Sequence, residues 1–164
     1  MNKLLLATEK GLAICERDTN DWHESLRGLT DQHVTSVIAR EGVILAGTER
    51  GVFRSDDGGQ TWREASNGLT NQHIRWMAFH LDISDLEFAG TEPANIFVSH
   101  DGGESWRACE EVAQLRDKHK WSLPYSPEAG CVRGFAFHGS RAYAAVEVGG
   151  LLRSDDSGET WHLA

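Results

Sequence analysis

The stretch S-D-D-G-G-Q-T-W at residues 55–62 recurs as S-H-D-G-G-E-S-W at residues 99–106 and as S-D-D-S-G-E-T-W at residues 154–161. Glycine tolerates the positive φ of a tight turn, and the short Ser and Asp side chains hydrogen-bond to backbone N–H groups that the turn leaves without partners. The closing tryptophan begins the next strand and buries its ring beneath the turn. A fourth, decayed copy, C-E-R-D-T-N-D-W at residues 15–22, keeps an aspartate and the tryptophan, as atypical terminal repeats do. These four segments, called boxes below, predict a protein built of repeated β-hairpins.

The repeats extend outward from the boxes. Residues 24–34 match residues 64–74, and residues 74–80 match residues 132–138. Four units in 164 residues average about 41 residues each, which is the length of a four-stranded propeller blade. We therefore predict an all-β fold, a β-propeller segment of four four-stranded blades in a single domain, residues 1–164. The blades are expected at about residues 1–27, 28–67, 68–109 and 131–164, with an insertion at 110–130.

The first blade is predicted to lack its inner strand, because only three strands fit between Met1 and the second unit. This gives 15 strands in all. Exposed blade faces and unpaired strand edges are costly in water and favour association. The sequence therefore indicates either a fragment of a larger propeller or a half-propeller that completes itself as a homodimer.

The boxes at matching places resemble the Asp-box or BNR repeat family, which includes sialidases, sortilin-type receptors, some glucanases and photosystem II assembly-factor-like proteins. The chain is most similar to the bacterial cytoplasmic BNR-like repeat proteins. The resemblance implies that each box joins the third and fourth strands of a blade and that the box has a structural role, not a catalytic one. It therefore indicates the fold and carries almost no information about chemistry.

Charge and composition exclude some classes of partner. The net charge is −9, from 16 basic and 25 acidic side chains, which disfavours nonspecific binding to nucleic acid or to an anionic membrane. The apolar run near Met1 is too short for a signal peptide, so we expect a soluble, cytoplasmic protein. Cys15, Cys109 and Cys131 have no metal-ligand spacing and are expected to be reduced thiols. A disulfide between Cys109 and Cys131 needs the ends of the insertion to converge, and a reducing compartment opposes it.

Alternating strand direction brings the hairpins after the second strands and the loops before the inner strands to one face, opposite the boxes. We expect a ligand on that face. The candidate residues there are Glu9, Glu49, Glu92, Glu147, His33, His73, Arg75 and Arg133. The competing interpretation is that the glutamates are solvated hairpin residues repeated by duplication and that the histidines only cap turns. Zinc ligation by His33, His73 and Cys131 is a further alternative, but equivalent positions on neighbouring blades are far apart, so we predict no metal and no cofactor.

The insertion adds His119 and Trp121 to the candidates. Its first half, from Glu110, has the composition for one or two helical turns, and its second half places two prolines among aromatic residues. The bacterial BNR-like proteins resemble this chain in a W-S-x-P segment before an inner strand that begins V-R, here Val132 and Arg133. Aromatic and basic side chains together suit stacking on a sugar or pairing with a carboxylate. A lid over the channel mouth is the alternative.

The function we predict is a non-catalytic binding or assembly module that presents a surface for a protein partner or for a small carbohydrate or carboxylate ligand. The alternative is one part of a sialidase- or glucanase-like glycosidase whose remaining blades supply the other half of the active site. Sialidases are similar to one another in an arginine cluster, a tyrosine nucleophile and an acidic aspartate. Arg75 and Arg133 could represent two of the arginines, but the tyrosines are only Tyr125 and Tyr143. Catalysis by this chain alone is therefore not expected.

Overall fold

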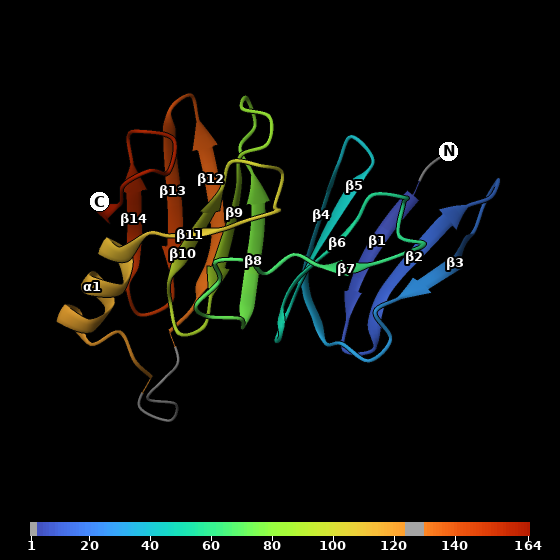
Figure 1. Ribbon diagram of the computed structural model, residues 1–164, viewed down its shortest axis with the longest axis horizontal. Coiled ribbons are helices and arrows are strands. Elements are labelled where there is room, and N and C mark those ends of the chain that lie inside the picture. Colours follow the sequence, from blue (N-terminus) through green and yellow to red (C-terminus); the bar gives the residue numbers. More distant parts are fainter. Residues whose placement is uncertain (1–2, 124–129) are drawn as a thin grey trace.

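The computed structural model describes residues 3–123 and 130–164, and it consists of four antiparallel sheets that stand side by side (Figure 1). We call the sheets blades 1 to 4 in chain order. In each, the strands follow one another as in a meander. Blade 1 contains β1 (Lys3–Thr8), β2 (Gly11–Arg17) and β3 (Trp22–Gly28). Blade 2 contains β4 (Val34–Arg40), β5 (Val43–Thr48), β6 (Gly51–Ser55) and β7 (Arg63–Glu64). Blade 3 contains β8 (Ile74–Phe79), β9 (Glu87–Thr91), β10 (Ile96–Ser99) and β11 (Arg107–Ala108). Blade 4 contains β12 (Val132–His138), β13 (Arg141–Val146), β14 (Gly150–Ser154) and β15 (His162–Leu163).

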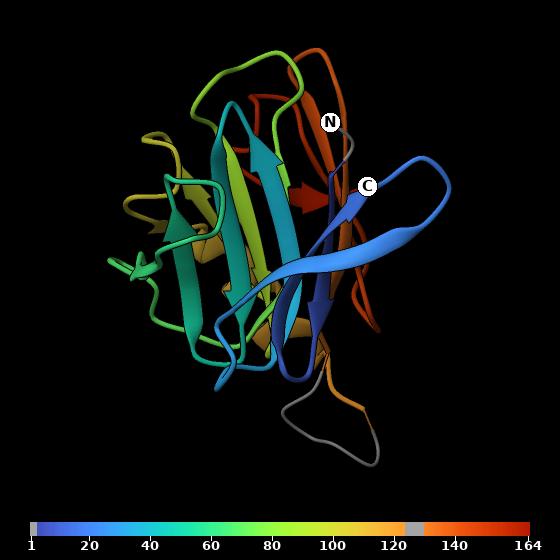
Figure 2. The same ribbon diagram turned by 90° about the vertical axis from the view of Figure 1, so that its right-hand side faces the viewer.

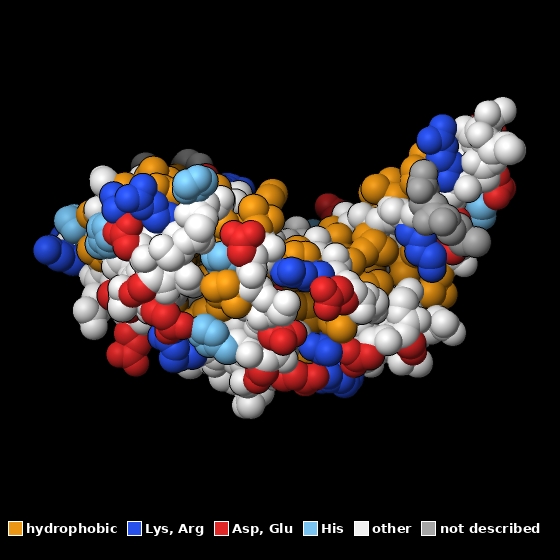
Figure 3. Space-filling view, turned by 90° about the horizontal axis from the view of Figure 1, so that it is seen from above, with side chains coloured by type: hydrophobic (Ala, Val, Ile, Leu, Met, Phe, Trp, Pro, Cys, Tyr) orange, Lys and Arg blue, Asp and Glu red, His pale blue; other side chains and the backbone are white. Residues whose placement is uncertain are grey.

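The predicted all-β propeller segment is confirmed, including the incomplete first blade. Among the described residues blade 1 has three strands, and its β1–β2 hairpin corresponds to the β5–β6 hairpin of blade 2, so the strand that it lacks there is the inner one. Figure 2 looks along the row of sheets with blade 1 in front. Figure 3 looks down on the box end and shows a curved body that is hollowed on one side.

Apolar side chains between neighbouring sheets hold the blades together. One cluster joins blades 1 and 2 around Leu12 and Ile44, and a second joins blades 2 and 3 around Leu45 and Phe97. The largest joins blades 3 and 4 around Phe88, which is fully buried. Because burial of apolar surface drives folding, and a single sheet buries only what its neighbour covers, each blade depends on the next.

The three intact boxes share one hydrogen-bond pattern. The Ser Oγ donates to the box aspartate and accepts the N–H of the fifth residue, Gly59, Gly103 or Gly158, at 2.8 Å. The aspartate in turn accepts the backbone N–H and the hydroxyl of the seventh residue, as Asp57 does from Thr61. These bonds satisfy the turn's backbone, as the motif predicts.

The fifth glycine of each box also fixes the distance to the preceding blade. A Cβ on Gly103 would lie 2.5 Å from a methyl carbon of Leu45 in blade 2, and one on Gly158 would lie 2.1 Å from the ring of Phe88 in blade 3. Both glycines have positive φ. Glycine is therefore required at this position by the turn and by the packing of one blade on the next.

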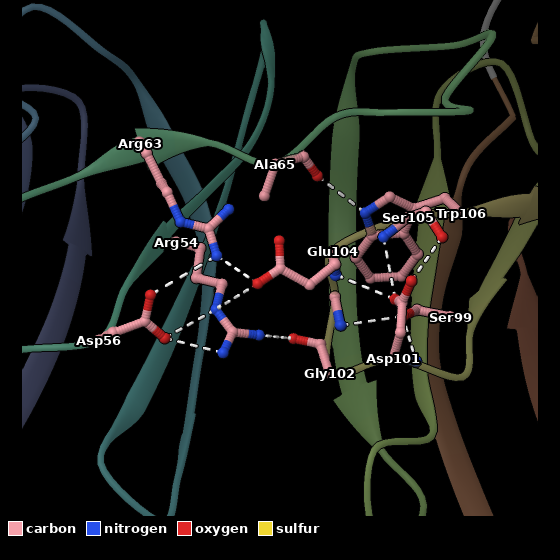
Figure 4. Close-up of polar contacts among 11 residues, drawn as sticks. Arg54, Asp56, Arg63, Ala65, Ser99, Asp101, Gly102, Glu104, Ser105 and Trp106 are labelled. Atoms are coloured by element: carbon pink, nitrogen blue, oxygen red, sulfur yellow. Dashed lines mark hydrogen bonds and ion pairs between the residues drawn. The ribbon is translucent and has the colours of Figure 1, made fainter.

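The seam between blades 2 and 3 combines an indole with charged side chains (Figure 4). The Trp106 indole N–H donates to the Ala65 carbonyl at 2.9 Å, across the seam. Arg54, largely buried, pairs with Asp56 at 2.7 Å and donates to the Gly102 carbonyl of the next box. The decayed box of blade 1 makes a plain turn instead, and its Trp22 is 46% exposed.

The insertion forms a longer helix than expected. The helix α1 (Glu110–His119) follows β11 and buries Val112. Glu111 accepts the Trp161 N–H of blade 4 at 2.9 Å, and Arg116 donates to the Ala94 carbonyl of blade 3 at 3.2 Å. The helix therefore fastens these two blades together. Residues 124–129, the second half of the insertion with its two prolines, lie outside the described residues.

Candidate functional site

A groove of about 450 Å³ opens at the end of the molecule opposite the boxes. All four blades contribute to it, through the end of β1 and the beginnings of the inner strands β4, β8 and β12. Its lining residues are Ala7, Thr8, Glu9, His33, Val34, Thr35, Arg75, Trp76, Val132 and Arg133. Four of these, Glu9, His33, Arg75 and Arg133, are candidates that the sequence predicts on this face.

The backbone gives the groove its side chains through a repeated irregularity. Each inner strand shifts register against its neighbour at its second residue, which is Thr35 in β4, Arg75 in β8 and Arg133 in β12. Bulges of this kind re-aim a side chain next to a site. The three bulged residues all line the groove.

Each complete blade pairs its hairpin glutamate with a residue at the beginning of its own inner strand. Glu49 Oε1 lies 2.8 Å from His33 Nδ1 in blade 2. In blade 3 Glu92 lies 3.5 Å from Arg75, and in blade 4 Glu147 lies 2.8 Å from Arg133. The hairpin glutamates therefore make repeated contacts at the rim of the groove: Glu92 and Glu147 form ion pairs with arginines, and Glu49 is hydrogen-bonded to His33. Glu9 is the exception, because blade 1 has no inner strand, and it has no ion-pair partner within residues 3–123 and 130–164.

The charge states at the rim follow from these contacts. The hydrogen bond from Arg133, reinforced by one from the Cys131 thiol, lowers the pKa of Glu147. The same Glu147 hydrogen bond raises the pKa of Arg133. Both groups are therefore ionised at neutral pH. A guanidinium has five N–H donors, so Arg75 and Arg133 keep donors for an anionic ligand beside their intramolecular partners.

Six of the ten lining residues were not among the sequence-based candidates, and two of these six, Trp76 and Thr35, matter most for the site. Trp76 follows Arg75 and exposes 46% of its surface, and an indole is a large flat apolar surface. Alternation along the strand would place Trp76 on the side opposite to Arg75, so no sequence signal pointed to it; the bulge at Arg75 allows both to line the groove. Thr35 joins the inner strands of blades 2 and 3, because its hydroxyl lies 2.6 Å from the Ile74 carbonyl. No sequence pattern pointed to Thr35.

Other candidates lie away from the groove. Trp121 is 6% exposed and packs in the core between blades 3 and 4, so its ring is not available to stack on a ligand, contrary to expectation. His119 stacks on Trp121 at the end of α1, with ring centroids 6.5 Å apart. His73 does not repeat the role of His33: its buried Nε2 has no hydrogen-bond partner among the residues that the structure describes, and Glu92 pairs with Arg75 instead.

The arrangement does not bring metal ligands together. In the part of the chain that the structure describes, no three His, Cys, Asp or Glu side chains gather in a way that could hold a metal ion. Cys15, Cys109 and Cys131 are buried and unpaired, so the structure has no bridge between Cys109 and Cys131. Burial raises the pKa of Cys109 to about 12, which makes its thiol unreactive.

A different titratable group lies at the box end. Glu87, at the beginning of β9, is 5% exposed, and in the described part of the chain its Oε2 has no hydrogen-bond partner. Burial, and to a lesser degree the nearby charge of Asp85, raises its pKa to about 7. It lines a cavity of about 100 Å³ together with Arg54 and Asp101. This cavity lies at the end of the blades opposite the groove.

The fold and the boxes together define the class. Radially packed antiparallel sheets, joined by serine-aspartate-glycine-tryptophan hairpins between third and fourth strands, make a β-propeller segment. The BNR/Asp-box repeat family matches residues 53–64 and 97–108, which contain the boxes of blades 2 and 3. The chain thus contains BNR/Asp-box repeats within a β-propeller segment.

Solved structures show the same fold at low sequence identity. An ancestral GH74 enzyme superimposes with a TM-score of 0.67 and 19% identity over 97% of this chain and 22% of that chain. YCF48 from Cyanidioschyzon merolae gives a TM-score of 0.64 and 16% identity over 98% of this chain and 52% of that one. YCF48 bound to D1 peptide gives a TM-score of 0.51 and 14% identity over 96% of this chain and 75% of that one.

The chain therefore spans about a fifth of the GH74 enzyme and about half of the Cyanidioschyzon YCF48. At these identities the likeness concerns the fold alone. No curated protein sequence matches the chain. No helix among the described residues is both long and apolar enough to cross a membrane.

Proposed function

We propose that this chain is a non-catalytic binding or assembly module whose ligand surface is the groove opposite the boxes. The observation that carries the proposal is the convergence of two arginines, Arg75 and Arg133, and the exposed Trp76 on one groove of about 450 Å³. Guanidinium groups recognise carboxylates by paired hydrogen bonds, and an indole offers an apolar platform. A ligand with a carboxylate and an adjoining flat or apolar part has the complementary chemistry.

The partner we propose is a polypeptide with an acidic residue or a free carboxyl terminus. The YCF48 complex with a D1 peptide supports a peptide partner for this kind of propeller. A small carbohydrate acid is the second ligand class that the same chemistry would accept. The three buried, unpaired thiols support a reducing compartment such as the cytoplasm as the place of action.

The alternative is part of a glycosidase, which the likeness to GH74 enzymes supports. Most glycosidases need two carboxyl groups across the scissile bond, one of them kept protonated by a raised pKa. The rim carboxylate Glu147 has a lowered pKa and is paired with Arg133. Glu87, whose pKa is raised, lies at the box end, where Arg54 and Asp101 share its cavity. We therefore favour binding without catalysis.

Binding assays with matched arginine variants test this proposal. The chain would be titrated with peptides that end in a free or an amidated carboxyl group and applied to a glycan array. Arg75→Ala and Arg133→Ala should each weaken carboxylate binding about tenfold, which is the loss of one charge-assisted hydrogen bond. Arg63→Ala, an exposed arginine at the box end, is the control and should bind as the wild type does.

The opposite outcome has a clear signature. If a panel of fluorogenic sialosides and glucosides showed turnover that Arg75→Ala and Arg133→Ala abolished, the groove would be an active site and the proposal would be wrong. Equal binding by the wild type, both groove variants and the Arg63→Ala control would place the ligand elsewhere.

A further inference from the structure

Blade 1 presents the edge of a strand that is paired on one side only. Within residues 3–123 and 130–164, β1 pairs with β2 and has no second neighbour in its sheet, whereas the corresponding β5, β9 and β13 each have an inner strand beside them. In an antiparallel strand every second backbone N–H and C=O points away from the neighbour. The free edge of β1 therefore offers a row of donors and acceptors along the length of Lys3–Thr8.

The β1–β2 hairpin already has the geometry of a complete blade. Thr8 Oγ1 donates to the Gly11 carbonyl at 2.6 Å and accepts the Lys10 N–H at 3.2 Å. Thr48 makes the same two bonds in blade 2, at 2.9 Å each. The end of β1 is thus preformed for an inner strand, and little rearrangement would be needed to add one.

Two hollows lie beside this edge, one near each end of β1. The groove of about 450 Å³ is lined by Ala7 to Glu9 of blade 1 and by Val34 and Thr35 of β4. A mainly apolar hollow of about 390 Å³ at the box end is lined by Lys3 and Leu5 of β1 and by Ala39 and Arg40 of β4. Figure 3 shows hydrophobic side chains along the arm that blade 1 forms. An extended segment beside β1 would place side chains in both hollows.

The charge of Glu9 indicates which residue the added segment should carry at one position. In blades 3 and 4 the second residue of the inner strand is an arginine paired with the hairpin glutamate, as Arg75 is with Glu92 and Arg133 with Glu147. Glu9 occupies the same hairpin position, is exposed, and has no ion-pair partner among the described residues. An added strand in the same register would bring its second residue to Glu9.

We propose that the free edge of β1 accepts an extended segment of a partner polypeptide as the fourth strand of blade 1, with an arginine at the second position of that segment paired to Glu9. The backbone ladder supplies affinity, the ion pair fixes register, and alternate apolar side chains fill the hollows toward β4. The ladder uses backbone groups of β1 and not the guanidinium groups of Arg75 and Arg133, although the added side chains would share the groove with the carboxylate ligand proposed above.

A peptide with the sequence of residues 72–80, Q-H-I-R-W-M-A-F-H, is the probe, because it copies an inner strand of this chain. Fluorescence anisotropy of the labelled peptide with the whole chain should show saturable binding. Replacing the peptide's arginine by glutamate should lower its affinity for the wild-type chain five- to tenfold. The Glu9→Gln chain should bind the unchanged peptide more weakly by a similar factor. Glu9→Arg should bind the glutamate peptide better than the wild type does. Glu64→Gln, an exposed glutamate on β7, is the matched control and should have no effect.

Backbone probes distinguish strand addition from other modes. Bound peptide should slow hydrogen exchange at every second amide of β1, and N-methylation of one alternating set of peptide amides should abolish binding while the other set is tolerated. The proposal is overturned if the two N-methyl sets bind equally, if protection appears away from β1, or if charge at Glu9 has no influence. Protection of β1 that depends on chain concentration without peptide would also overturn it, because the occupant would then be a second copy.

Discussion

At the scale of single residues, short polar side chains and glycines determine the hairpins. Asp57 has a pKa lowered to about 2 by the Thr61 hydroxyl first, then by the Thr61 N–H and the Ser55 hydroxyl. The carboxylate is therefore needed in its charged form to hold the turn. The stability that it contributes is present above its unfolded pKa of 3.8 and is lost as the pH falls toward 2.

Glu87 is predicted to have the opposite pH dependence. Its pKa is about 7 in the folded chain and 4.5 when exposed, so the folded state holds more protons between these values. The free energy of unfolding should therefore fall as the pH rises from 4.5 to 7, by at most about 3 kcal/mol. Glu87→Gln should remove this loss and should exceed the wild type in stability at pH 8.

Urea unfolding at pH 5 and pH 8, followed by tryptophan fluorescence, measures this effect. Glu64→Gln is the control, because Glu64 is exposed, and it should leave the pH dependence of the wild type unchanged. The same slope with pH in Glu87→Gln and in the wild type would contradict the prediction.

At the scale of elements, the stability of the molecule depends on the seams between sheets. The indoles differ in what they join: Trp106 donates to Ala65 of the preceding blade, whereas Trp62 donates to Gly59 of its own box. Arg54 makes a second hydrogen bond across the same seam, because its guanidinium donates to the Gly102 carbonyl of blade 3. Exposed pairs such as Arg107 with Glu159 contribute about 1 kcal/mol or less.

Replacing Trp106 by phenylalanine is expected to weaken the seam between blades 2 and 3. The change removes the N–H donor and leaves the Ala65 carbonyl without its partner in a buried place, at a cost of about 2–3 kcal/mol. Trp62→Phe, the matched control, should cost about 1 kcal/mol, because Trp62 is less buried and its bond lies within one hairpin. Chemical denaturation of both variants measures the difference. Equal losses in the free energy of unfolding would show that the bond across the seam contributes no more than the bond within one hairpin.

At the scale of the whole molecule, the outward faces of the two end blades are apolar. Leu4 and Leu6 on β1, each 41% exposed, pair across the sheet with Cys15 and Ala13 on the face away from blade 2. Leu151 on β14 is 47% exposed on the side opposite the buried Leu152. Because such faces are covered by a neighbouring blade elsewhere in the chain, we propose that they pack against a second copy or against further blades.

Association is therefore predicted to depend on the end faces. Leu6→Lys and Leu151→Lys should each lower the average mass measured by light scattering after size exclusion, because a charge on either face opposes its burial. Leu81→Lys is the control, since Leu81 is 69% exposed in the loop between β8 and β9, away from both faces. A wild-type chain that stays monomeric at all concentrations would contradict the prediction.

Local sequence patterns determined the repeats, the hairpins and the absent inner strand of blade 1. This succeeded because the box turns depend on contacts within eight residues, such as the hydrogen bond that the Gly103 N–H donates to Ser99 Oγ. The same patterns placed Glu9, His33, Arg75 and Arg133 at one end of the blades, because alternating strand direction fixes the end at which each hairpin or loop lies.

The tertiary structure alone decided which side chains are free. Trp121 is buried by the packing of blades 3 and 4, Trp76 is left exposed, and Glu9 lacks the partner that Glu92 and Glu147 have. These outcomes depend on contacts between segments far apart in the chain, and the sequence carries no local record of them. Spacing and turn chemistry thus determined the repeated architecture, whereas packing between blades determined the surface available to a partner.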